Sequence, residues 1–301
     1  MKAFHINRYT TGILALFFIV FLFSCQKENS LSDSDSLTEA QAAEYSDESA
    51  QAEASFDDVQ DISMTAADEE GLASEGTGRS AENWFPPRFD ELRLRLGPCA
   101  TITVFPNDST YPKTITIDFG DGCICADGKF RKGAVVLHLT GPIRRSGSVL
   151  TITFDDYYVN RAHIEGTKII SNLSNNGNII FTVQVVGGKV TFPNGRGYEY
   201  NGLKYVRQIE GGSTRPLRDD VYKIEGRSQT EFNNGLTLTL NTETPLIKRF
   251  TCHWISEGTL KIRINSRVFF LDYGFPNNGR CDNKALLNWN NGNNQRVILL
   301  P

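Results

Sequence analysis

Apolar and polar residues alternate strictly along several stretches of the chain beyond residue 100. In "KTITIDF", Ile115, Ile117 and Phe119 fall on one side and the residues between them fall on the other. The same alternation recurs in "VLTITFDD" (149–156), "GLTLTLNT" (235–242) and "TLKIRIN" (259–265). Alternation with a period of two predicts antiparallel strands that are buried on one face only.

Turn signals separate these predicted strands at short intervals, as in Pro106-Asn107-Asp108 and Asn233-Asn234-Gly235. Helical periodicity is nearly absent beyond residue 84. Many strands joined by hairpins form a wide sheet with one apolar face, and such a sheet must curl onto itself or split into two packed layers. The sequence therefore predicts an all-β domain over residues 84–301, in which a large antiparallel sheet curls into a sandwich or a partly closed barrel.

The N-terminus carries an apolar run, Ile13 to Phe23, preceded by basic residues. A run of this length and place predicts a secretory signal peptide over residues 1–24. It ends in Leu22-Phe23-Ser24-Cys25, which resembles a lipobox and implies that the Cys25 thiol is acylated, for example with palmitate. The alternative is an ordinary signal peptide followed by a chance cysteine.

The residues after Cys25, Gln26-Lys27-Glu28-Asn29, resemble the surface-export tether of lipoproteins in the Bacteroidota. No aspartate stands next to Cys25, so the rule for inner-membrane retention is not met. The resemblance implies an outer-membrane lipoprotein that is exposed at the cell surface. A polar tether that faces the periplasm is the alternative.

Charge divides the chain into two parts. Residues 26–83 contain 16 Asp and Glu against Lys27 and Arg79, a net charge of −14, whereas residues 84–301 carry 27 Lys and Arg against 19 Asp and Glu, a net charge of +8. An acidic segment this poor in apolar residues predicts a disordered tether over residues 25–83. Phe56, Val59 and Ile62 could form one helical stripe over a few turns. Nucleic acid is excluded as a partner of a surface-anchored chain.

Cysteine spacing suggests a duplicated hairpin plan. Cys99 leads a strand, a turn and "TIDFGDGC" to Cys123, and Cys252 leads a strand, a turn and "LDYGFPNNGRC" to Cys281. The acidic residues between the matched positions differ, so we interpret "TIDFGDGCICADGK" as a turn and not a reactive site. The echo predicts disulfides between Cys99 and Cys123 and between Cys252 and Cys281. Cys125 is left over, and pairing of Cys99 with Cys125 stays open.

A shorter echo also recurs, as Ile164-Glu165-Gly166-Thr167, Ile209-Glu210-Gly211, Ile224-Glu225-Gly226-Arg227 and Ser256-Glu257-Gly258-Thr259. Glycine inside a strand often marks a bulge or a close backbone approach. The repetition predicts a recurring bend in the sheet.

The sequence contains no catalytic signature and implies no cofactor. His138, His163 and His253 stand alone, without a second ligand at metal-binding spacing. Asp118, Asp121 and Asp127 could hold calcium, but a solvated acidic turn is the preferred interpretation. Paired carboxylates of the kind a glycosidase needs occur at Asp155-Asp156, Glu165, Glu199 and Asp219-Asp220. Their separation in space cannot be read from the sequence. Because no catalytic signature is present, the chain is predicted not to be an enzyme.

Five tyrosines are interleaved with basic residues and are candidates for stacking on sugar rings: Tyr157, Tyr158, Tyr198, Tyr200 and Tyr205. The alternative is that they form cross-strand pairs that stiffen the sheet. Asp35-Ser36-Leu37 and Asp108-Ser109-Thr110 resemble the O-glycosylation site of secreted Bacteroidota proteins, which implies modification at Ser36 and Ser109.

Longer stretches, among them "TITIDFGDGC", "FDDYYVNRAHIEGTKIISN", "GGKVTFPNG" and "CHWISEGTLKI", resemble a family of uncharacterised secreted lipoproteins of the Bacteroidota. The resemblance covers most of residues 99–290 and brings no assigned activity.

The sequence is therefore compatible with three functions. The first is a surface-tethered, non-enzymatic β module that binds extracellular material, preferably glycan, or has a structural role in the envelope. The second is a glycan-directed hydrolase. The third is a periplasmic carrier of an apolar ligand. A groove lined by tyrosines favours the first, two carboxylates facing each other in a cleft favour the second, and a hollow lined by aliphatic side chains and phenylalanine favours the third.

Overall fold

The computed structural model describes residues 37–75, 86–214, 217–277 and 279–300. The predicted signal peptide, the lipidation site Cys25 and the candidate glycosylation site Ser36 lie outside the described residues.

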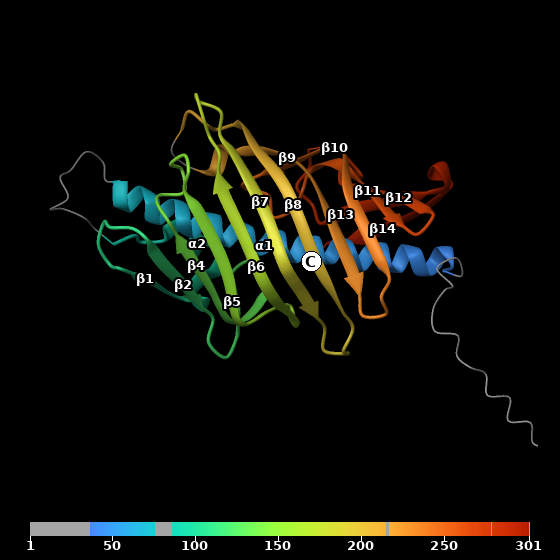
Figure 1. The fold of residues 1–301 in the computed structure, drawn as a ribbon, viewed down its shortest axis with the longest axis horizontal. Helices are drawn as coiled ribbons and strands as arrows, with labels where there is room; N and C mark the ends of the chain where they lie inside the picture. Colours follow the sequence, from blue (N-terminus) through green and yellow to red (C-terminus); the bar gives the residue numbers. More distant parts are fainter. Residues whose placement is uncertain (1–36, 76–85, 215–216, 278, 301) are drawn as a thin grey trace, which may run out of the picture. The chain divides into compact units, whose positions relative to one another are not determined.

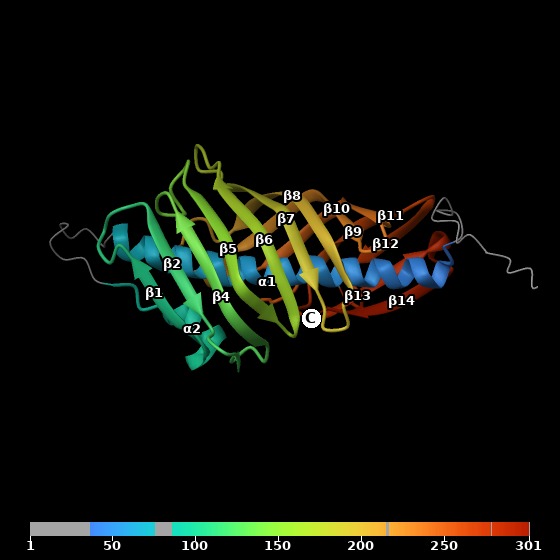
Figure 2. The ribbon, with the colours of Figure 1, turned by 60° about the horizontal axis from the view of Figure 1, so that its bottom comes forward.

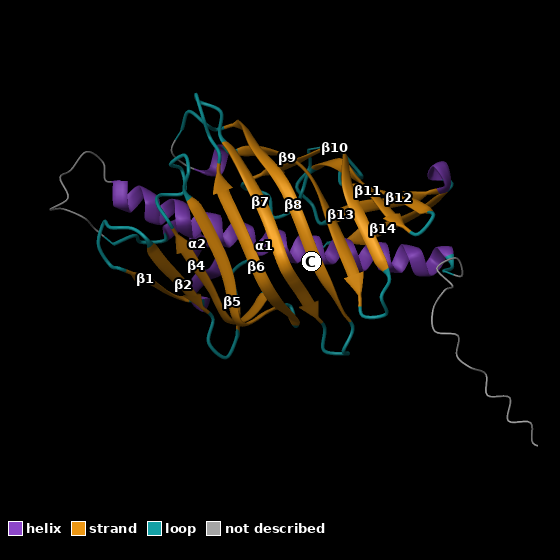
Figure 3. Cartoon of the chain, viewed as in Figure 1, coloured by secondary structure: helices purple, strands orange, loops and turns teal. Residues whose placement is uncertain are grey.

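One antiparallel sheet of 14 strands contains about half of the described residues (Figures 1 and 3). Its strands are β1 (Thr101–Phe105), β2 (Lys113–Asp118), β3 (Cys123–Ile124), β4 (Phe130–Leu139), β5 (Val149–Val159), β6 (Ala162–Asn172), β7 (Ile180–Thr191), β8 (Gly197–Glu210), β9 (Val221–Phe232), β10 (Thr237–Arg249), β11 (Glu257–Ile264), β12 (Arg267–Asp272), β13 (Lys284–Trp289) and β14 (Asn294–Leu299). Strand neighbours follow chain order, except that the short β3 pairs only with β4. The order runs from β1 to β14 without pairing these two strands, so the sheet is open. The predicted large antiparallel sheet is confirmed.

The alternation seen in the sequence sets which side chains enter the core. In the register between β2 and β4, Ile115 lies opposite Leu137 and Ile117 lies opposite Val135. All four are fully buried. Thr116 and Val136, which stand between them, lie on the outer face of the sheet, as the period of two requires.

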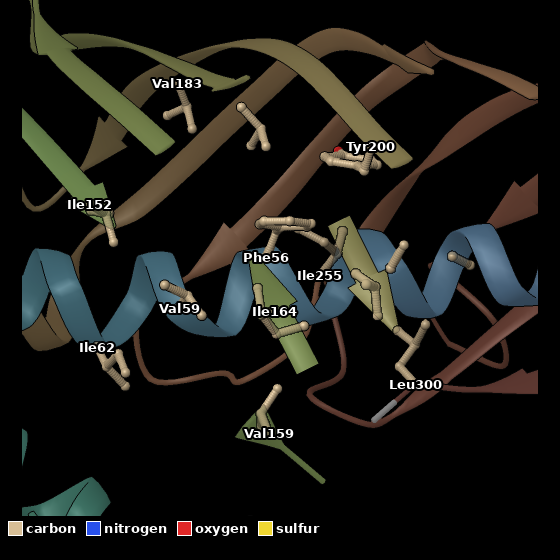
Figure 4. Packing of buried hydrophobic residues seen from close by; sticks show 14 of the residues in the cluster. Phe56, Val59, Ile62, Ile152, Val159, Ile164, Val183, Tyr200, Ile255 and Leu300 are labelled. Atoms are coloured by element: carbon tan, nitrogen blue, oxygen red, sulfur yellow. The ribbon is translucent and has the colours of Figure 1, made fainter. Parts of the chain in front are cut away.

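A long helix, α1 (Glu39–Glu75), follows the inner face of the sheet. Figure 2 shows strands passing on both sides of α1, so that the sheet curls around the helix. Phe56, Val59 and Ile62 are buried at this interface (Figure 4), and the Phe56 ring stacks on Tyr200 with ring centroids 5.0 Å apart. Alanines at six buried positions let the helix backbone approach the strands closely: Ala42, Ala43, Ala50, Ala52, Ala66 and Ala67.

The prediction of a disordered tether is therefore wrong for residues 39–75. The helical stripe of Phe56, Val59 and Ile62 is present, but it is part of the central core and not an isolated few turns. The boundary drawn at residue 84 also divides one compact unit, because buried residues of α1 and of the strands belong to one hydrophobic core. The physical reason is that the acidic side chains of α1 find buried cations on the sheet, as described below.

A second helix, α2 (Asp90–Leu96), and the 3-10 turns η2 (Gly97–Cys99), η3 (Leu217–Asp219) and η4 (Asn290–Gly292) complete the described elements. The Glu69 carboxylate of α1 accepts hydrogen bonds from the backbone N–H groups of Glu91 (2.9 Å) and Leu92 (3.0 Å). These are first-turn N–H groups that α2 itself leaves unpaired. The side chain of α1 thereby fixes where α2 begins.

Three of the four repeated glycines, Gly166, Gly226 and Gly258, lie where strands approach closely, as predicted, whereas Gly211 falls after the end of β8. Gly166 of β6 has φ +111° and lies at a register shift against β7, where a Cβ would be 2.6 Å from the Gly187 carbonyl oxygen. Gly258 of β11 has φ +102°, and a Cβ there would be 2.3 Å from the Pro245 oxygen of β10. Only glycine permits such a close approach between strands, and bulges of this kind increase local twist and bend a sheet.

Both predicted disulfides are present. Cys99 is bonded to Cys123, and Cys252 is bonded to Cys281. Cys125 is buried and forms no disulfide, although its Sγ lies 3.0 Å from the Sγ of Cys99.

Candidate functional site

The inner face of the sheet carries a series of buried cations that point at α1. They lie on the even-numbered strands from β2 to β10: Lys113, Arg131, Lys168, Lys204 and Lys248. Each occupies an inward position in the alternation of its strand; Lys113, for example, shares its face with Ile115, and Lys168 shares its face with Ile170. Buried cations are costly unless they are paired, so the sheet alone lacks the anions that its interior requires.

Asp58 of α1 is the centre of the densest charge cluster. Its carboxylate lies 2.8 Å from Arg131 Nη2, 3.2 Å from Lys129 Nζ and 3.3 Å from Arg95 Nη2. Asp127 binds the same guanidinium, at 2.8 Å from Nη2 and 2.9 Å from Nη1. Burial alone would raise the pKa of Asp58, but attraction to Arg131, Lys129 and Arg95 outweighs it and holds the pKa well below 3.8.

The middle of α1 is held in the same way by lysines of β6, β8 and β10. Lys204 lies 2.8 Å from both Glu53 and Asp57, and Lys248 lies 2.7 Å from Asp61. Lys168 donates to the Phe56 carbonyl oxygen at 2.7 Å and is 3.9 Å from Asp57. Burial lowers the pKa of Lys168 to about 8, because its charge is only partly compensated.

The two ends of α1 are also fixed by polar contacts. Near its start, Glu39 accepts hydrogen bonds from Asn290 (2.8 Å) and Trp289 (3.3 Å) at the end of the chain. Near its other end, Glu70 pairs with Lys113 at 3.2 Å. The acidic and basic parts of the sequence therefore neutralise each other across one internal interface.

This interface was missed by the sequence analysis, although a signal for it was present. Lys113 shares the inward face with Ile115 and Ile117, and Lys168 shares it with Ile170. A cation at an apolar position of a period-two pattern predicts a buried anion elsewhere in the chain. Residues 26–83 are the segment with a surplus of such anions.

A narrow cavity lies between α1 and the inner face of strands β6 to β10. Its apolar walls come from six side chains of the sheet and the turn after β10: Ile170, Phe181, Val183, Val206, Ile224 and Phe250. Met64 of α1 lines the opposite side. The polar lining consists of Tyr222, the Asp61–Lys248 ion pair and Gln60, whose Oε1 is buried and accepts no hydrogen bond from the described residues.

A second hollow, of about 730 Å³ including its open side, lies on the outer face at β8, β9 and β10. Tyr205, Arg227 and Asn241 line it, together with Glu225 and Glu243. This hollow is separated from the first cavity by the sheet, because Tyr205 points outward while its neighbours Lys204 and Val206 point toward α1.

The five candidate tyrosines do not form one surface. Tyr157, Tyr198 and Tyr200 are buried in the core, with at most 1% of each side chain exposed, so they cannot stack on a glycan in this structure. Tyr158 is half-buried, stacks on His163 at 4.5 Å and lies under the Lys132 ammonium. Tyr205 is 55% exposed in the outer hollow. The alternation of β5 and β8 divides the set between the two faces.

The remaining candidates fall in different places. Asp127 belongs to the inner charge cluster, while Asp118 accepts from the Gly120 N–H in the turn, so the proposed calcium ligands do not gather. His163 is 3.9 Å from Asp156 on the outer face, and His253 packs on Trp254. Ser109 is half-buried in the loop between β1 and β2.

In the described part of the chain, one group of side chains has metal-ligand spacing: Cys99, Cys123 and Cys125. Two of these three are joined in a disulfide and cannot offer thiolates.

Comparisons with protein-family models, with curated proteins and with solved structures give no match to this chain. Among the described residues, no helix combines the length and the apolar character needed to cross a membrane; α1 is long but acidic.

Proposed function

We propose that the protein is an outer-membrane lipoprotein of the bacterial envelope, anchored by lipid on Cys25 and exposed at the cell surface, whose helix–sheet module binds a small amphiphile without catalysis. The lipobox-like sequence around Cys25 supports the anchor, since two or three acyl chains hold a protein stably at a membrane. The cavity between α1 and the sheet supports the binding activity and is the observation on which this proposal rests.

The lining of the cavity has the character of a small-molecule site. Such sites are concave and combine mostly apolar walls with a few placed polar groups. Phe181, Val183 and Ile224 supply the apolar wall, while Gln60 and Lys248 lie at its polar side. A ligand with an apolar chain and a head that donates a hydrogen bond fits this distribution, because the buried Gln60 oxygen would gain a donor.

The other two functions receive less support from the geometry. A groove lined by several tyrosines would favour glycan binding, but three of the five tyrosines are buried. A hydrolase needs two carboxylates facing each other across a cleft. The carboxylates of the inner face, Asp57, Asp58 and Asp61, are instead each held by Lys or Arg side chains.

Binding can be tested with the fluorescent probe N-phenyl-1-naphthylamine, which is apolar and carries one N–H donor, titrated against residues 34–301. We expect saturable binding that is lost or weakened at least tenfold in Met64→Trp, because the indole fills the cavity. Leu72→Trp, on the exposed side of the same helix, should bind as the unsubstituted protein does. Equal binding by both variants would contradict the proposal, provided that urea unfolding shows both to be folded.

The anchor needs a separate test. Cells fed radiolabelled palmitate should label the full chain and not Cys25→Ala, and protease added to intact cells should remove the labelled protein. Unchanged labelling of Cys25→Ala, or full protection from protease, would contradict the location proposed above.

A further inference from the structure

The outer hollow at β8, β9 and β10 is built by an irregularity in strand pairing. Arg227 of β9 lies opposite both Leu203 of β8 and Asn241 of β10. Pairing between β9 and β10 then stops and resumes at Ile224 and Leu246. The segment from Arg227 to Ile224 on β9 therefore faces the segment from Asn241 to Leu246 on β10, which is two residues longer. The two extra residues form a bulge.

The bulge creates a rim beside a rigid floor. Residues Glu243 and Pro245 of the bulged segment are exposed and line the hollow. The Thr242 hydroxyl accepts from the Gly226 N–H at 2.9 Å, which holds the bulged strand against β9. Since the floor consists of three paired strands, the hollow exists without movement of the sheet.

Three polar side chains in the hollow have no partner within the described residues. Tyr205 offers an exposed ring, and its neighbours in the register are Glu225 directly opposite and Arg227 two residues further along β9. Side chains related in this way lie close enough for one ligand to touch both. Arg227 and Asn241 stand directly opposite each other, so an aromatic face, a guanidinium and an amide surround one space.

The charges around the hollow leave one cation uncompensated. Glu225 is paired with Lys223 at 3.0 Å, and Glu243 is paired with Lys261 at 3.6 Å. Arg227 makes no ion pair within the described residues. A guanidinium that is not engaged favours a carboxylate or similar oxyanion, which it can bind through two parallel hydrogen bonds.

We propose that this hollow binds an oligosaccharide that contains a uronic acid. The sugar ring stacks on Tyr205, its carboxylate binds Arg227, and its hydroxyl groups exchange hydrogen bonds with Asn241. This site lies on the opposite face of the sheet from the amphiphile cavity and does not depend on it.

The test titrates residues 34–301 with a panel of uronic-acid oligomers, namely pentagalacturonate, pentamannuronate and a hyaluronate hexasaccharide, beside neutral maltopentaose. We expect at least one acidic oligomer to bind and maltopentaose to bind at least ~10-fold more weakly, a factor that corresponds to about 1.4 kcal/mol. Tyr205→Ala and Arg227→Ala should each weaken binding by ~10-fold or more. Arg227→Lys should be intermediate, because lysine cannot form the bidentate contact.

Tyr158→Ala is the matched control, since Tyr158 is an outward tyrosine beside a lysine elsewhere on the sheet. It should leave binding unchanged. The proposal is overturned if no member of the panel binds, if maltopentaose binds equally well, or if the Arg227 and Tyr205 variants bind like the Tyr158 variant. All three positions lie on the outer face, and urea unfolding of each variant confirms that the fold is retained.

Discussion

Asp58 shows how one buried carboxylate can hold an acidic helix in the core of a protein, through ion pairs with the residues around it. A buried carboxylate is unfavourable alone, but three cations within 3.3 Å reverse the balance. Because its pKa is lowered on folding, Asp58 contributes stability above about pH 4 that is lost as the pH falls further. The same residue in an exposed helix would contribute little.

Replacement of Asp58 by Asn should lower the free energy of unfolding by about 3 kcal/mol at pH 7, because Arg131 and Lys129 would stay buried with less negative charge beside them. Urea denaturation measures this change. Asp90→Asn is the control, since Asp90 forms an exposed pair with Arg88 at 3.8 Å and should change the free energy by less than ~0.5 kcal/mol. Equal effects of the two substitutions would refute this account of Asp58.

Lys168, in contrast to Asp58, is expected to destabilise the folded protein at pH 7. Its pKa falls from the ordinary lysine value of 10.5 to about 8 in the folded protein, so the folded state carries an under-compensated charge below pH 8. Lys168→Met should therefore raise the free energy of unfolding at pH 7 by about 2 kcal/mol, after allowance for the lost hydrogen bond to Phe56.

The pH dependence of this gain identifies its cause. Between pH 8 and 10.5 the unfolded chain keeps a proton that the folded chain has released, so the stability of the unsubstituted protein rises across this window. The advantage of Lys168→Met should shrink over the same range. A gain that stays constant from about pH 7 to about pH 10 would point to packing rather than to charge. Urea titrations at several pH values make the comparison.

At the scale of elements, the strands were predictable and the helix was not. Strand positions such as Ile115, Ile117 and Leu238 follow a local rule, because the pleat fixes the face of each residue. Helix α1 depends on partners far away in the sequence: Asp58 binds Arg131 and Asp61 binds Lys248, which are 73 and 187 residues apart. Local composition therefore indicated a disordered segment, and only the inward lysines of the strands signalled the missing anions.

The candidate site was predictable to a smaller extent. The disulfides followed from an echo within the sequence, and the outward position of Tyr205 follows from strand alternation. The cavity did not, because its two sides come from α1 and from strands about 100 residues or more further along the chain. The hollow on the outer face depends on the bulge in β10. Pro245 is a local signal for it, because proline inside a paired strand is found at bulges, but it does not show which side chains gather there.

A chain without α1 should not keep the native structure. Residues 86–301 would expose five inward cations and the apolar face that α1 covers, so we expect no cooperative urea unfolding and strong binding of a hydrophobic dye. Addition of a peptide of residues 37–75 should restore native tryptophan fluorescence. A peptide of the same length with Glu53, Asp57, Asp58 and Asp61 changed to Asn and Gln is the control and should not. Cooperative unfolding of residues 86–301 alone would contradict this prediction.

At the scale of the whole molecule, α1 shortens the distance between the proposed lipid anchor and the folded module. From Cys25 to Glu39 the chain can span at most about 50 Å, whereas a flexible segment from residue 25 to residue 83 could span about 200 Å. If Cys25 is acylated, the module stays near the membrane surface.

Energy transfer from labelled vesicle lipids to a dye at Asn291, next to the start of α1, tests this reach on the acylated full chain. We expect efficient transfer, and a clear decrease when about 30 Gly/Ser residues are inserted after Asn29, because such a linker adds tens of ångströms of reach. Similar transfer in both proteins would show that the distance is not set by where α1 begins.

The contact between Glu39 and Asn290 joins residues 251 positions apart and bears on how the chain acquires its structure. Helix α1 leaves the ribosome early, but the strands that enclose it are complete only when the last residues have been made. Formation of such non-local contacts is slow. Because α1 is acidic and rich in alanine, it stays soluble until the strands have been made. This offers a reason why the negatively charged half of the interface precedes the strands in the sequence.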